Sequence, residues 1–243
     1  MNCKISIVVP AFNEERLLPE SLKAINNASA AFADAGWTSE LIVCDNNSTD
    51  RTAEIAAAAG ARVVFEPVNQ ISRARNAGAA RATGEWLLFV DADWYPTKEL
   101  FADVVAAISD SRCVAGGSTV RVDLHGIQYD AVVGFWNRLS RSLKWAAGSF
   151  IFCETAAFRE VGGFTDKLYA AEEINLFRRL KRFARSQGRS IVILHRHPLL
   201  TSHRKAHLYT LREMLRFWIR TVATGGRTLR SSRESFPWYD GRR

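Results

Sequence analysis

Apolar runs alternate with amphipathic segments through the first 95 residues of the chain. Ile5–Val9 is an uninterrupted apolar run, which is typical of a strand buried on both faces in a parallel sheet. Residues 14–35 carry apolar side chains at helical spacing. The remaining expected elements are strands at Leu41–Cys44, Arg62–Phe65 and Trp86–Val90, a helix capped by Asp50 and a helix over Ser72–Ala82. This alternation predicts an α/β fold with a parallel sheet and right-handed crossovers.

After Tyr95 the alternation is less regular. The expected elements are helices at Lys98–Ser109, Ala171–Gln187 and His207–Ala223, and strands at Val114–Val122, Ser149–Cys153 and Ser190–Leu194. The tail from Thr224 is rich in Gly, Arg and Ser, and we expect it to be poorly packed. No linker divides the chain, so we expect one domain over residues 1–205, in halves 1–95 and 96–205, followed by a helix and basic tail over 206–243.

The composition and net charge indicate which classes of binding partner are favoured, but they do not identify one. The chain has 243 residues, of which 47% are hydrophobic and 24% charged, as in a globular protein rather than a disordered one. The formal charge is +8, which favours anionic partners such as nucleotides, phosphorylated substrates, acidic membrane surfaces or nucleic acid.

The cysteines and the apolar segments bear on the cellular compartment. Cys3, Cys44, Cys113 and Cys153 form no C-x-x-C pair, so neither a zinc site nor a disulfide framework is indicated. There is no signal-peptide pattern and no uncharged apolar run of roughly 18 residues. We therefore expect a cytoplasmic protein, with contact to the inner face of the membrane as an option.

Two carboxylates follow the fourth expected strand. The segment Leu87–Val90 is apolar and is followed by Asp91-Ala92-Asp93. Hard cations such as Mg²⁺ bind one or two carboxylates together with substrate phosphate oxygens. On this motif alone, a simple turn after a strand explains the pattern equally well.

Further polar motifs accompany this pair. They are Val8–Glu15 after the first strand, Val43–Asp50 after the second, Arg73–Gly78, Gly162-Gly163-Phe164 and Ala171-Glu172-Glu173. Ligands of parallel sheets bind beyond the carboxyl ends of the strands, where the first two motifs and the Asp pair are expected. With these motifs in this order, residues from about Ile5 to Leu180 resemble the inverting glycosyltransferases called family 2.

The resemblance implies a GT-A fold, which is a Rossmann-like, mostly parallel central sheet flanked by helices, here with a C-terminal amphipathic helix. It implies transfer of a sugar from a nucleotide-diphosphate sugar, with UDP-sugars favoured, and a requirement for Mg²⁺ or Mn²⁺. Residues 1–95 would then bind the donor, and residues 96–205 would form the acceptor and catalytic half. The acceptor is unidentified; a glycan or a lipid-linked acceptor fits, and nucleic acid is not expected.

On the donor side, Pro10, Asn13 and Glu14 resemble the family's first donor-site loop. Asp45 matches the acidic residue that hydrogen-bonds the nucleotide base. The family often has a second Asp next, where this chain has Asn46, so the resemblance does not fix the nucleotide.

Arg73 and Arg75 lie in the segment that approaches the base and the diphosphate in the family. Asp91 and Asp93 resemble its metal-binding D-x-D motif, with Asp93 as the direct ligand. A surface ion pair is the alternative role for Arg75.

The later Glu-Asp pair of the family is represented by Glu172-Glu173, which places Glu173 at the position of the catalytic base. A base of this kind accepts the proton of the acceptor hydroxyl. The alternative is that both acids only begin a helix, where the helix dipole favours them.

A late histidine often completes the metal shell in GT-A enzymes, and His195 or His203 could do so here. The alternative is that these histidines are ordinary polar loop residues. Arg204 lies in a stretch that resembles a late Ser-x-Arg segment, where it could meet the diphosphate.

Two amphipathic segments have open roles. One is an apolar helical stripe, flanked by arginines, that consists of Leu211, Met214, Leu215, Trp218, Ile219 and Val222. It could lie in a membrane interface or pack on the catalytic core. The other segment interleaves Phe135, Trp136 and Trp145 with Arg138, Arg141 and Lys144, and could be core, acceptor platform or membrane contact.

Two other functions remain possible from the sequence. A nucleotidyltransferase shares the strand–helix alternation and the metal carboxylates, but it normally has a Gly-rich, basic loop after the first strand, which this chain lacks. A non-catalytic basic protein that binds nucleotide or membrane would fit the charge, but it would not require the donor-site motifs.

Overall fold

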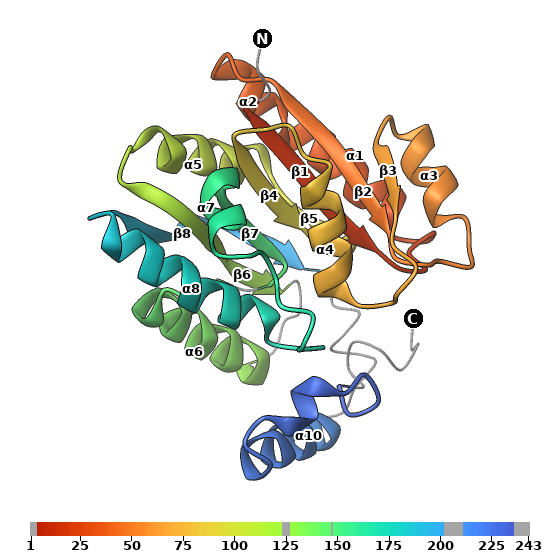
Figure 1. Cartoon of the computed structure of the whole chain (residues 1–243), viewed down its shortest axis with the longest axis vertical. Helices are drawn as coiled ribbons and strands as arrows, with labels where there is room; N and C mark the ends of the chain where they lie inside the picture. The colour runs from red at the N-terminus through yellow and green to blue at the C-terminus, as the bar shows by residue number, and fades with distance from the viewer. Residues whose placement is uncertain (1–3, 123–126, 147, 202–210, 236–243) are drawn as a thin grey trace.

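An eight-stranded sheet forms the centre of the part of the chain that the computed structural model describes, residues 4–122, 127–146, 148–201 and 211–235 (Figure 1). The strands are β1 (Ile5–Ala11), β2 (Ser39–Asp45), β3 (Arg62–Phe65), β4 (Trp86–Val90), β5 (Trp94–Tyr95), β6 (Cys113–Val122), β7 (Phe150–Glu154) and β8 (Ser190–Thr201). The helices are α1 (Leu18–Ala28), α2 (Ala30–Asp34), α3 (Thr52–Ala58), α4 (Ile71–Ala80), α5 (Lys98–Ser109), α6 (Ile127–Leu143), α7 (Thr155–Glu160), α8 (Glu172–Ser186), α10 (Leu211–Ala223) and the 3₁₀ helix η1 (Arg227–Arg230).

The strand order is β3-β2-β1-β4-β7-β6-β8-β5. The first four strands in this order are parallel, and β6 and β8 are parallel to each other. β7 is antiparallel to both of its neighbours, and β5 is antiparallel to β8. The mostly parallel sheet flanked by helices is therefore as predicted, whereas the two strand reversals were not anticipated.

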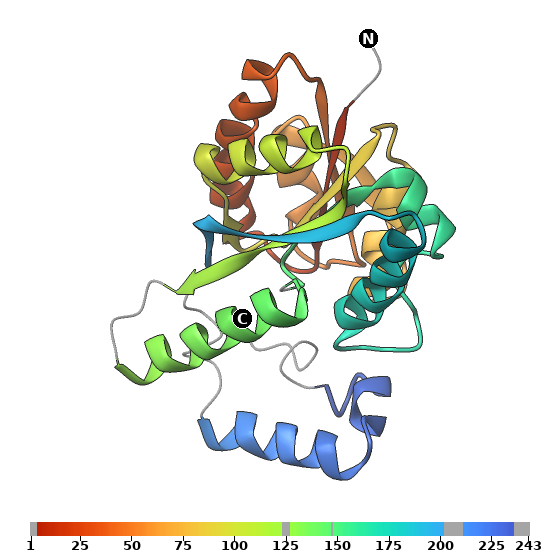
Figure 2. The same ribbon diagram turned by 90° about the vertical axis from the view of Figure 1, so that its left-hand side faces the viewer.

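Helices cover both faces of the sheet, which explains the uninterrupted apolar strands. On one face, α1, α2 and α5 pack on a core in which the rings of Phe32 and Phe101 stack with centroids 4.9 Å apart (Figure 2). On the other face, α7 and α8 pack over Phe89, which contacts the rings of Phe158 and Phe164 at 5.4 and 5.1 Å. Phe164 anchors the Gly-Gly-Phe motif in this second core.

Several boundaries differ from the sequence expectation. The long first helix is two helices, α1 and α2, and at their junction Ser29 Oγ donates a hydrogen bond to the Ile25 carbonyl at 2.8 Å, a contact that favours bending. The last strand continues to Thr201 because β8 pairs with both β6 and β5. The aromatic and basic segment before residue 145 is mostly the helix α6, and the short helix α7 was not predicted.

The C-terminal helix is α10, which begins at Leu211. Phe217 is buried, and Thr221 Oγ1 lies 2.8 Å from Thr228 Oγ1 of η1. Of the predicted apolar stripe, only the side chain of Ile219 is among those described, and it is 60% exposed. The packing of the rest of the stripe stays a prediction, as does the division into residues 1–205 and 206–243. Among the described residues, no helix is both long enough and apolar enough to cross a membrane.

A hydrogen-bond network joins the amino ends of β1, β2 and β4, opposite the loops discussed below. Glu40 Oε1 accepts hydrogen bonds from Ser6 Oγ at 2.6 Å and from the Thr83 backbone N–H and Oγ1 at 2.6 and 2.8 Å. Ser6 Oγ in turn accepts from the Gly84 N–H at 2.8 Å. Burial alone would raise the pKa of Glu40, but these hydrogen bonds and the charge of Arg62 outweigh it and hold the pKa below its usual value.

We predict that Glu40→Gln lowers stability at neutral pH by about 1 kcal/mol, because hydrogen bonds to a charged acceptor are stronger than those to a neutral one. A lowered folded-state pKa contributes stability above the unfolded pKa, and this contribution is lost as the pH falls through the folded pKa. The difference in urea midpoint between wild type and variant should therefore shrink below about pH 4. A difference that stays constant from pH 7 to pH 3 would contradict the prediction.

Candidate functional site

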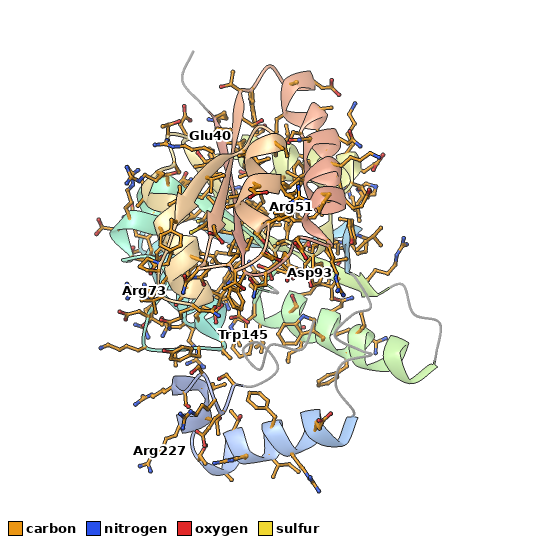
Figure 3. The ribbon with its side chains drawn as sticks, turned by 90° about the vertical axis from the view of Figure 1, so that its right-hand side faces the viewer. Glu40, Arg51, Arg73, Asp93, Trp145 and Arg227 are labelled. Atoms are coloured by element: carbon orange, nitrogen blue, oxygen red, sulfur yellow. The ribbon has the colours of Figure 1, made fainter. Side chains whose placement is uncertain are left out.

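The carboxyl ends of β1, β2 and β4 bring three predicted loops to one edge of the sheet. Ala11 pairs with Asp45 and Val8 pairs with Phe89, so the segments that follow these strands leave the sheet side by side. Asp93 lies at this edge (Figure 3). Pro10 is itself part of β1, where it is buried and pairs with Cys44.

The first two loops are tied to each other through Asn13. Its backbone φ is +51°, a left-handed conformation that Asn tolerates better than most residues. Asn13 Oδ1 accepts a hydrogen bond from the Thr49 N–H at 2.8 Å, and the Asn13 N–H donates to Ser48 Oγ at 3.0 Å. The neighbouring Glu14 is buried, and its N–H donates to Thr52 Oγ1 at 2.8 Å. Asn13 thus fixes the relative position of the loops, a role that the sequence did not reveal.

Asp45 is the last residue of β2 and is buried. Its Oδ1 accepts the Ser48 N–H at 3.0 Å, which closes a tight turn after the strand. No described residue hydrogen-bonds its other carboxylate oxygen. One face of the carboxylate is therefore held by the turn while the other remains able to accept a hydrogen bond.

Asn46 has a structural role that explains the amide at this position. Its Nδ2 donates to the carbonyls of Glu66 and Val68 at 3.2 and 2.6 Å, and its Oδ1 accepts the Gln70 N–H at 2.9 Å. Gln70 Nε2 then donates to two carbonyls in the segment 166–168, at 2.7 and 3.0 Å. An aspartate here would set a carboxylate against two carbonyl oxygens, so the loop that follows β3 is built for an amide.

Arg75 is the centre of a buried ion network. Its side chain is only 1% exposed. Nη1 donates to Glu172 Oε1 at 2.7 Å, while Nη2 donates to Asp91 Oδ1 and to the Gly148 carbonyl, both at 2.8 Å. The guanidinium carbon lies 5.2 Å from the centre of the Phe164 ring. Burial alone would lower the pKa of Arg75. The charges of Asp91 and Glu172 outweigh burial and raise the pKa above its usual value, so the guanidinium stays charged.

This arrangement differs from the expectation that Arg75 contacts the donor, and it also differs from a surface ion pair. The guanidinium is enclosed and bonded to the protein's own carboxylates, which leaves it no access to a diphosphate in this arrangement. Arg73 is 40% exposed, and its Nε donates to Glu66 Oε1 at 3.1 Å. It lines an open hollow of about 470 Å³ together with Glu66, Asn76, Ala77, Phe164 and Asp166.

Glu172 and Glu173 begin α8, as the helix-start alternative supposed, but they also face the network. Ala171 before them is in the left-handed region with φ +62°, which turns the chain into the helix. Glu173 lies against Gly148, since a Cβ added to that glycine would come within 3.2 Å of the Glu173 carboxyl carbon. Burial, followed by the charge of Glu172, raises the pKa of Glu173 to about 8. A carboxyl with a pKa near neutrality is suited to general-base chemistry.

The D-x-D residues fit a divalent ion in part. Asp93 is buried and Asp91 is mostly so, and one oxygen of Asp91 is held by Arg75. The assignment of Asp93 as the direct ligand stays a prediction. Within the described ranges, no group of three or more His, Cys, Asp or Glu side chains is placed to hold a metal. An ion at Asp93 would therefore need phosphate oxygens or water to complete its coordination, as Mg²⁺ commonly does.

The structure does not bring His195 to this pair. Trp94, next to Asp93, pairs with Thr201, whereas His195 follows Leu194, which pairs with Ser118, four residues before the β6 partner of Thr201; along β6 this is roughly 13 Å. His195 is exposed, with Nδ1 3.5 Å from the Ile193 carbonyl. His203 and Arg204 lie outside the described residues, so their predicted roles are not addressed by the structure.

Gly148 is a site residue that sequence reasoning missed. Its carbonyl accepts a hydrogen bond from Arg75, and the Glu173 carboxyl lies against the position where a Cβ would stand. The only signal in the sequence was a glycine just before the expected strand Ser149–Cys153, and nothing there indicates which side chain would fill the space that the glycine leaves.

The chain resembles known glycosyltransferases in sequence. The family model described as "Glycosyl transferase family 2" matches residues 6–162, more than half of the chain. An uncharacterized glycosyltransferase of Mycobacterium tuberculosis is 42% identical over 89 residues, which cover 37% of this chain and 36% of the relative. The poly(ribitol-phosphate) beta-N-acetylglucosaminyltransferase TarS of Staphylococcus aureus is 32% identical over 114 residues, 44% of this chain and 19% of TarS. The matched segments thus span little more than a third of these relatives at most.

Solved structures share the fold. TarS residues 1–349 in complex with UDP superpose with a TM-score of 0.64 at 21% identity, over 82% of this chain and 60% of that one. The glucosyl-3-phosphoglycerate synthase of Mycobacterium tuberculosis, in complex with Mn²⁺, UDP and phosphoglyceric acid, superposes with a TM-score of 0.62 at 20% identity, over 91% and 76%. This likeness confirms the predicted GT-A fold.

We predict that Arg75→Met destabilises the protein by about 3–5 kcal/mol, because it leaves two buried carboxylates without their partner. Arg73→Met is the matched control: it makes the same change two residues away at a half-exposed pair, and it should cost less than about 1 kcal/mol. Urea unfolding of both variants measures the difference.

If Arg75→Met does not fold, Arg75→Lys serves in its place. A lysine keeps the charge but cannot reach all three acceptors. The stability lost in Arg75→Lys should therefore fall between the losses in Arg73→Met and Arg75→Met. Equal, small losses for changes at positions 73 and 75 would show that the buried network contributes little to stability.

Proposed function

Because the chain belongs to glycosyl transferase family 2, we propose that this glycosyltransferase uses a nucleotide-diphosphate sugar, a divalent ion and the Glu173 base to transfer the sugar with inversion. The observation that carries the proposal is the Arg75 network. It joins the Asp91–Asp93 loop to the start of α8, so that a candidate metal ligand and a candidate base are held at the same edge of the sheet.

The proposed donor is a UDP-sugar. Support comes from Asp45 at the end of β2, because the turn after the strand uses one of its carboxylate oxygens and the other can accept a hydrogen bond from a uracil ring. The neighbours TarS and glucosyl-3-phosphoglycerate synthase were each solved with UDP. Pro10, Asn13 and Glu14 form the adjoining wall, with Asn13 holding it against the loop after β2.

The proposed cofactor is Mn²⁺ or Mg²⁺ held by Asp93, with Asp91 beside it. Support comes from the Mn²⁺ in the glucosyl-3-phosphoglycerate synthase complex and from the carboxylates of this loop. Such an ion would offset the negative charge that develops on the departing diphosphate. Arg75 contributes by holding Asp91 in place, which orients the loop that carries Asp93.

The proposed base is Glu173. It would accept the proton of the acceptor hydroxyl as the oxygen attacks the anomeric carbon from the face opposite the diphosphate, and attack from that face inverts the configuration. Glu172, held by Arg75, fixes the first turn of α8 and thereby the direction of the Glu173 carboxyl. Gly148 leaves room for that carboxyl, because any larger side chain would crowd it.

The acceptor is proposed only as a glycan or a lipid-linked molecule, and the location as cytoplasmic with peripheral contact to the membrane. The exposed Ile219, Arg216 and Arg220 of α10 would suit such a contact. The family match disfavours the alternatives of a nucleotidyltransferase and of a non-catalytic basic protein.

We predict that Asp93→Asn reduces the Mn²⁺-dependent affinity for UDP by more than about tenfold, which corresponds to about 1.4 kcal/mol. An amide keeps the shape of the side chain but removes the charge that attracts the ion. Calorimetric titration of UDP with and without Mn²⁺ measures the effect. Asp110→Asn, at an exposed ion pair with Arg112, is the control and should leave UDP affinity unchanged. Wild-type affinity in Asp93→Asn would exclude Asp93 from metal binding.

We predict that Glu173→Gln lowers single-turnover transfer by about 10²–10⁴-fold while UDP affinity stays unchanged. Glutamine has the size of glutamate but cannot accept a proton at neutral pH. Because the carboxyl must be ionised to act as a base, wild-type turnover should rise as the pH passes through about 8. Glu160→Gln on α7, an exposed acid, is the control for the substitution itself.

Stability separates a catalytic loss from a folding defect in the same variant. The folded-state pKa of Glu173 is raised, so wild type loses stability as the pH rises from the unfolded pKa of roughly 4.5 to about 8. Glu173→Gln has no such titrating group, so the melting temperature of the variant should rise relative to that of wild type as the pH increases over this range. A variant that is inactive and also less stable than wild type at pH 8 would argue against the base assignment.

A further inference from the structure

Four cations line the boundary between the C-terminal end of α6 and α8. We call Lys144, Arg178, Lys181 and Arg185 the cationic strip. Arg178, Lys181 and Arg185 are spaced three and four residues apart on α8, so they share one side of the helix. This side faces the end of α6, because Lys181 Nζ hydrogen-bonds the carbonyl of the last residue of that helix. In Figure 2 one end of α6 lies near α8, while the rest of α6 runs away from it.

The strip has no counter-ions in the part of the chain that the structure describes. None of its four cations pairs with a carboxylate among the described residues, whereas some exposed cations elsewhere do, as in Arg51–Glu54, Lys98–Asp34 and Arg112–Asp110. Partial burial, and then the charges of Arg185 and Lys144, lower the pKa of Lys181. The cations therefore repel one another, and an anion between them would relieve that repulsion.

The strip is linked to the proposed base through Trp145 and Gly148. The guanidinium carbon of Arg178 lies 5.9 Å from the centre of the Trp145 ring, and Trp145 precedes Gly148, which touches Glu173. Along the axis of α8, Arg178 is about 7.5 Å from Glu173 and Arg185 is about 18 Å from it, and both lie more than about 100° around the helix from Glu173. The strip thus leads away from the place where the acceptor hydroxyl would react.

We propose that the cationic strip is an acceptor subsite that binds the phosphate groups of a phosphorylated acceptor and so directs the acceptor's hydroxyl to Glu173. The proposal rests on the transfer function proposed above and adds the chemical class of the acceptor. Arginine matches phosphate with a planar pair of N–H donors, and lysine adds point charge. Stacking on Trp145 limits the motion of the Arg178 guanidinium, so less entropy is lost when the anion binds.

A membrane surface is the competing occupant, and the exposed residues disfavour it. Insertion into a bilayer interface requires large apolar side chains among the cations. Next to the strip, Leu143 is 37% exposed. The more exposed apolar side chains lie elsewhere, at Phe135 (69%) on α6 and at Ile219 on α10. The strip is therefore better matched to phosphate groups than to lipid.

Binding of a fluorescent inorganic polyphosphate, measured by anisotropy, tests the proposal. The double variant K181Q/R185Q removes two cations of the strip, while R81Q/R159Q removes two exposed cations outside it and changes the net charge equally. We expect K181Q/R185Q to weaken polyphosphate binding roughly tenfold, because two charge-assisted contacts are lost, and R81Q/R159Q to bind as wild type does. Equal affinity in all three proteins, or equal losses in both variants, would overturn the proposal.

A second arm replaces polyphosphate with vesicles of phosphatidylglycerol. If wild type binds vesicles but not polyphosphate, and K181Q/R185Q loses vesicle binding, the strip is a membrane contact and the proposal is wrong. Mn²⁺-dependent binding of UDP to wild type is measured in parallel. Failure of UDP binding would count against the proposed transfer function, whereas the polyphosphate result decides the strip alone, so the two failures can be told apart.

Discussion

One buried guanidinium holds the two halves of the site together. Arg75 lies on α4, whereas its partners come from the loop after β4, the turn before β7 and the first residue of α8. These segments are up to 97 residues apart in the chain, and the sheet alone does not fix α8 relative to β4. A planar group with donors on several sides can bind three acceptors at once, which an ammonium on a flexible stem does less well. The geometry of both carboxylate pairs therefore depends on this one side chain.

The same network sets the charge state of the site. One guanidinium stands against the carboxylates of Asp91, Glu172 and Glu173, so the positive charge is insufficient for all three to ionise without cost. Asp91 and Glu172 are bonded to it directly, and the charge of Arg75 counters the burial of Glu172. Glu173 is beside them without such a bond, and burial together with the charge of Glu172 raises its pKa to about 8. Burial thus raises the pKa of both glutamates at the start of α8, Glu172 in spite of its bond to Arg75 and Glu173 without such a bond.

Sequence patterns predicted most helices and strands, but they did not predict the contacts between residues that are far apart in the chain. The strands β3 and β4 and the helix α5 have the predicted bounds, because apolar periodicity records burial on the sheet. The family resemblance pointed to Asp93 and Glu173, whose roles stay predictions, and it placed Arg75 near the donor. Neither the resemblance nor the periodicity indicated the carboxylates that bind Arg75, because periodicity shows which side of a helix is buried and not which residues meet it. In the sequence, Asn46 in place of the family's second Asp left the nucleotide open, whereas the structure shows that its amide binds backbone groups of a loop that only the fold brings near. His195 was misplaced because β8 continues for seven residues beyond its expected end, which carries the strand past the histidine.

Helix α8 shows how a short segment can serve several purposes, because its sides are chemically distinct. Leu176, Phe177, Leu180 and Ala184 face the sheet and fix the helix in the core. Arg179, on another side, donates to the carbonyls of Val161 and Gly163, which holds the Gly-Gly-Phe turn that in turn supports the ring under Arg75. The third side carries the cationic strip, which makes no such contacts with acidic groups. Two of the three sides are thus explained by the fold itself. The cations on the remaining side repel one another, which contributes to the lowered pKa of Lys181. Such a cluster of like charges is explained by the anionic ligand proposed for the strip.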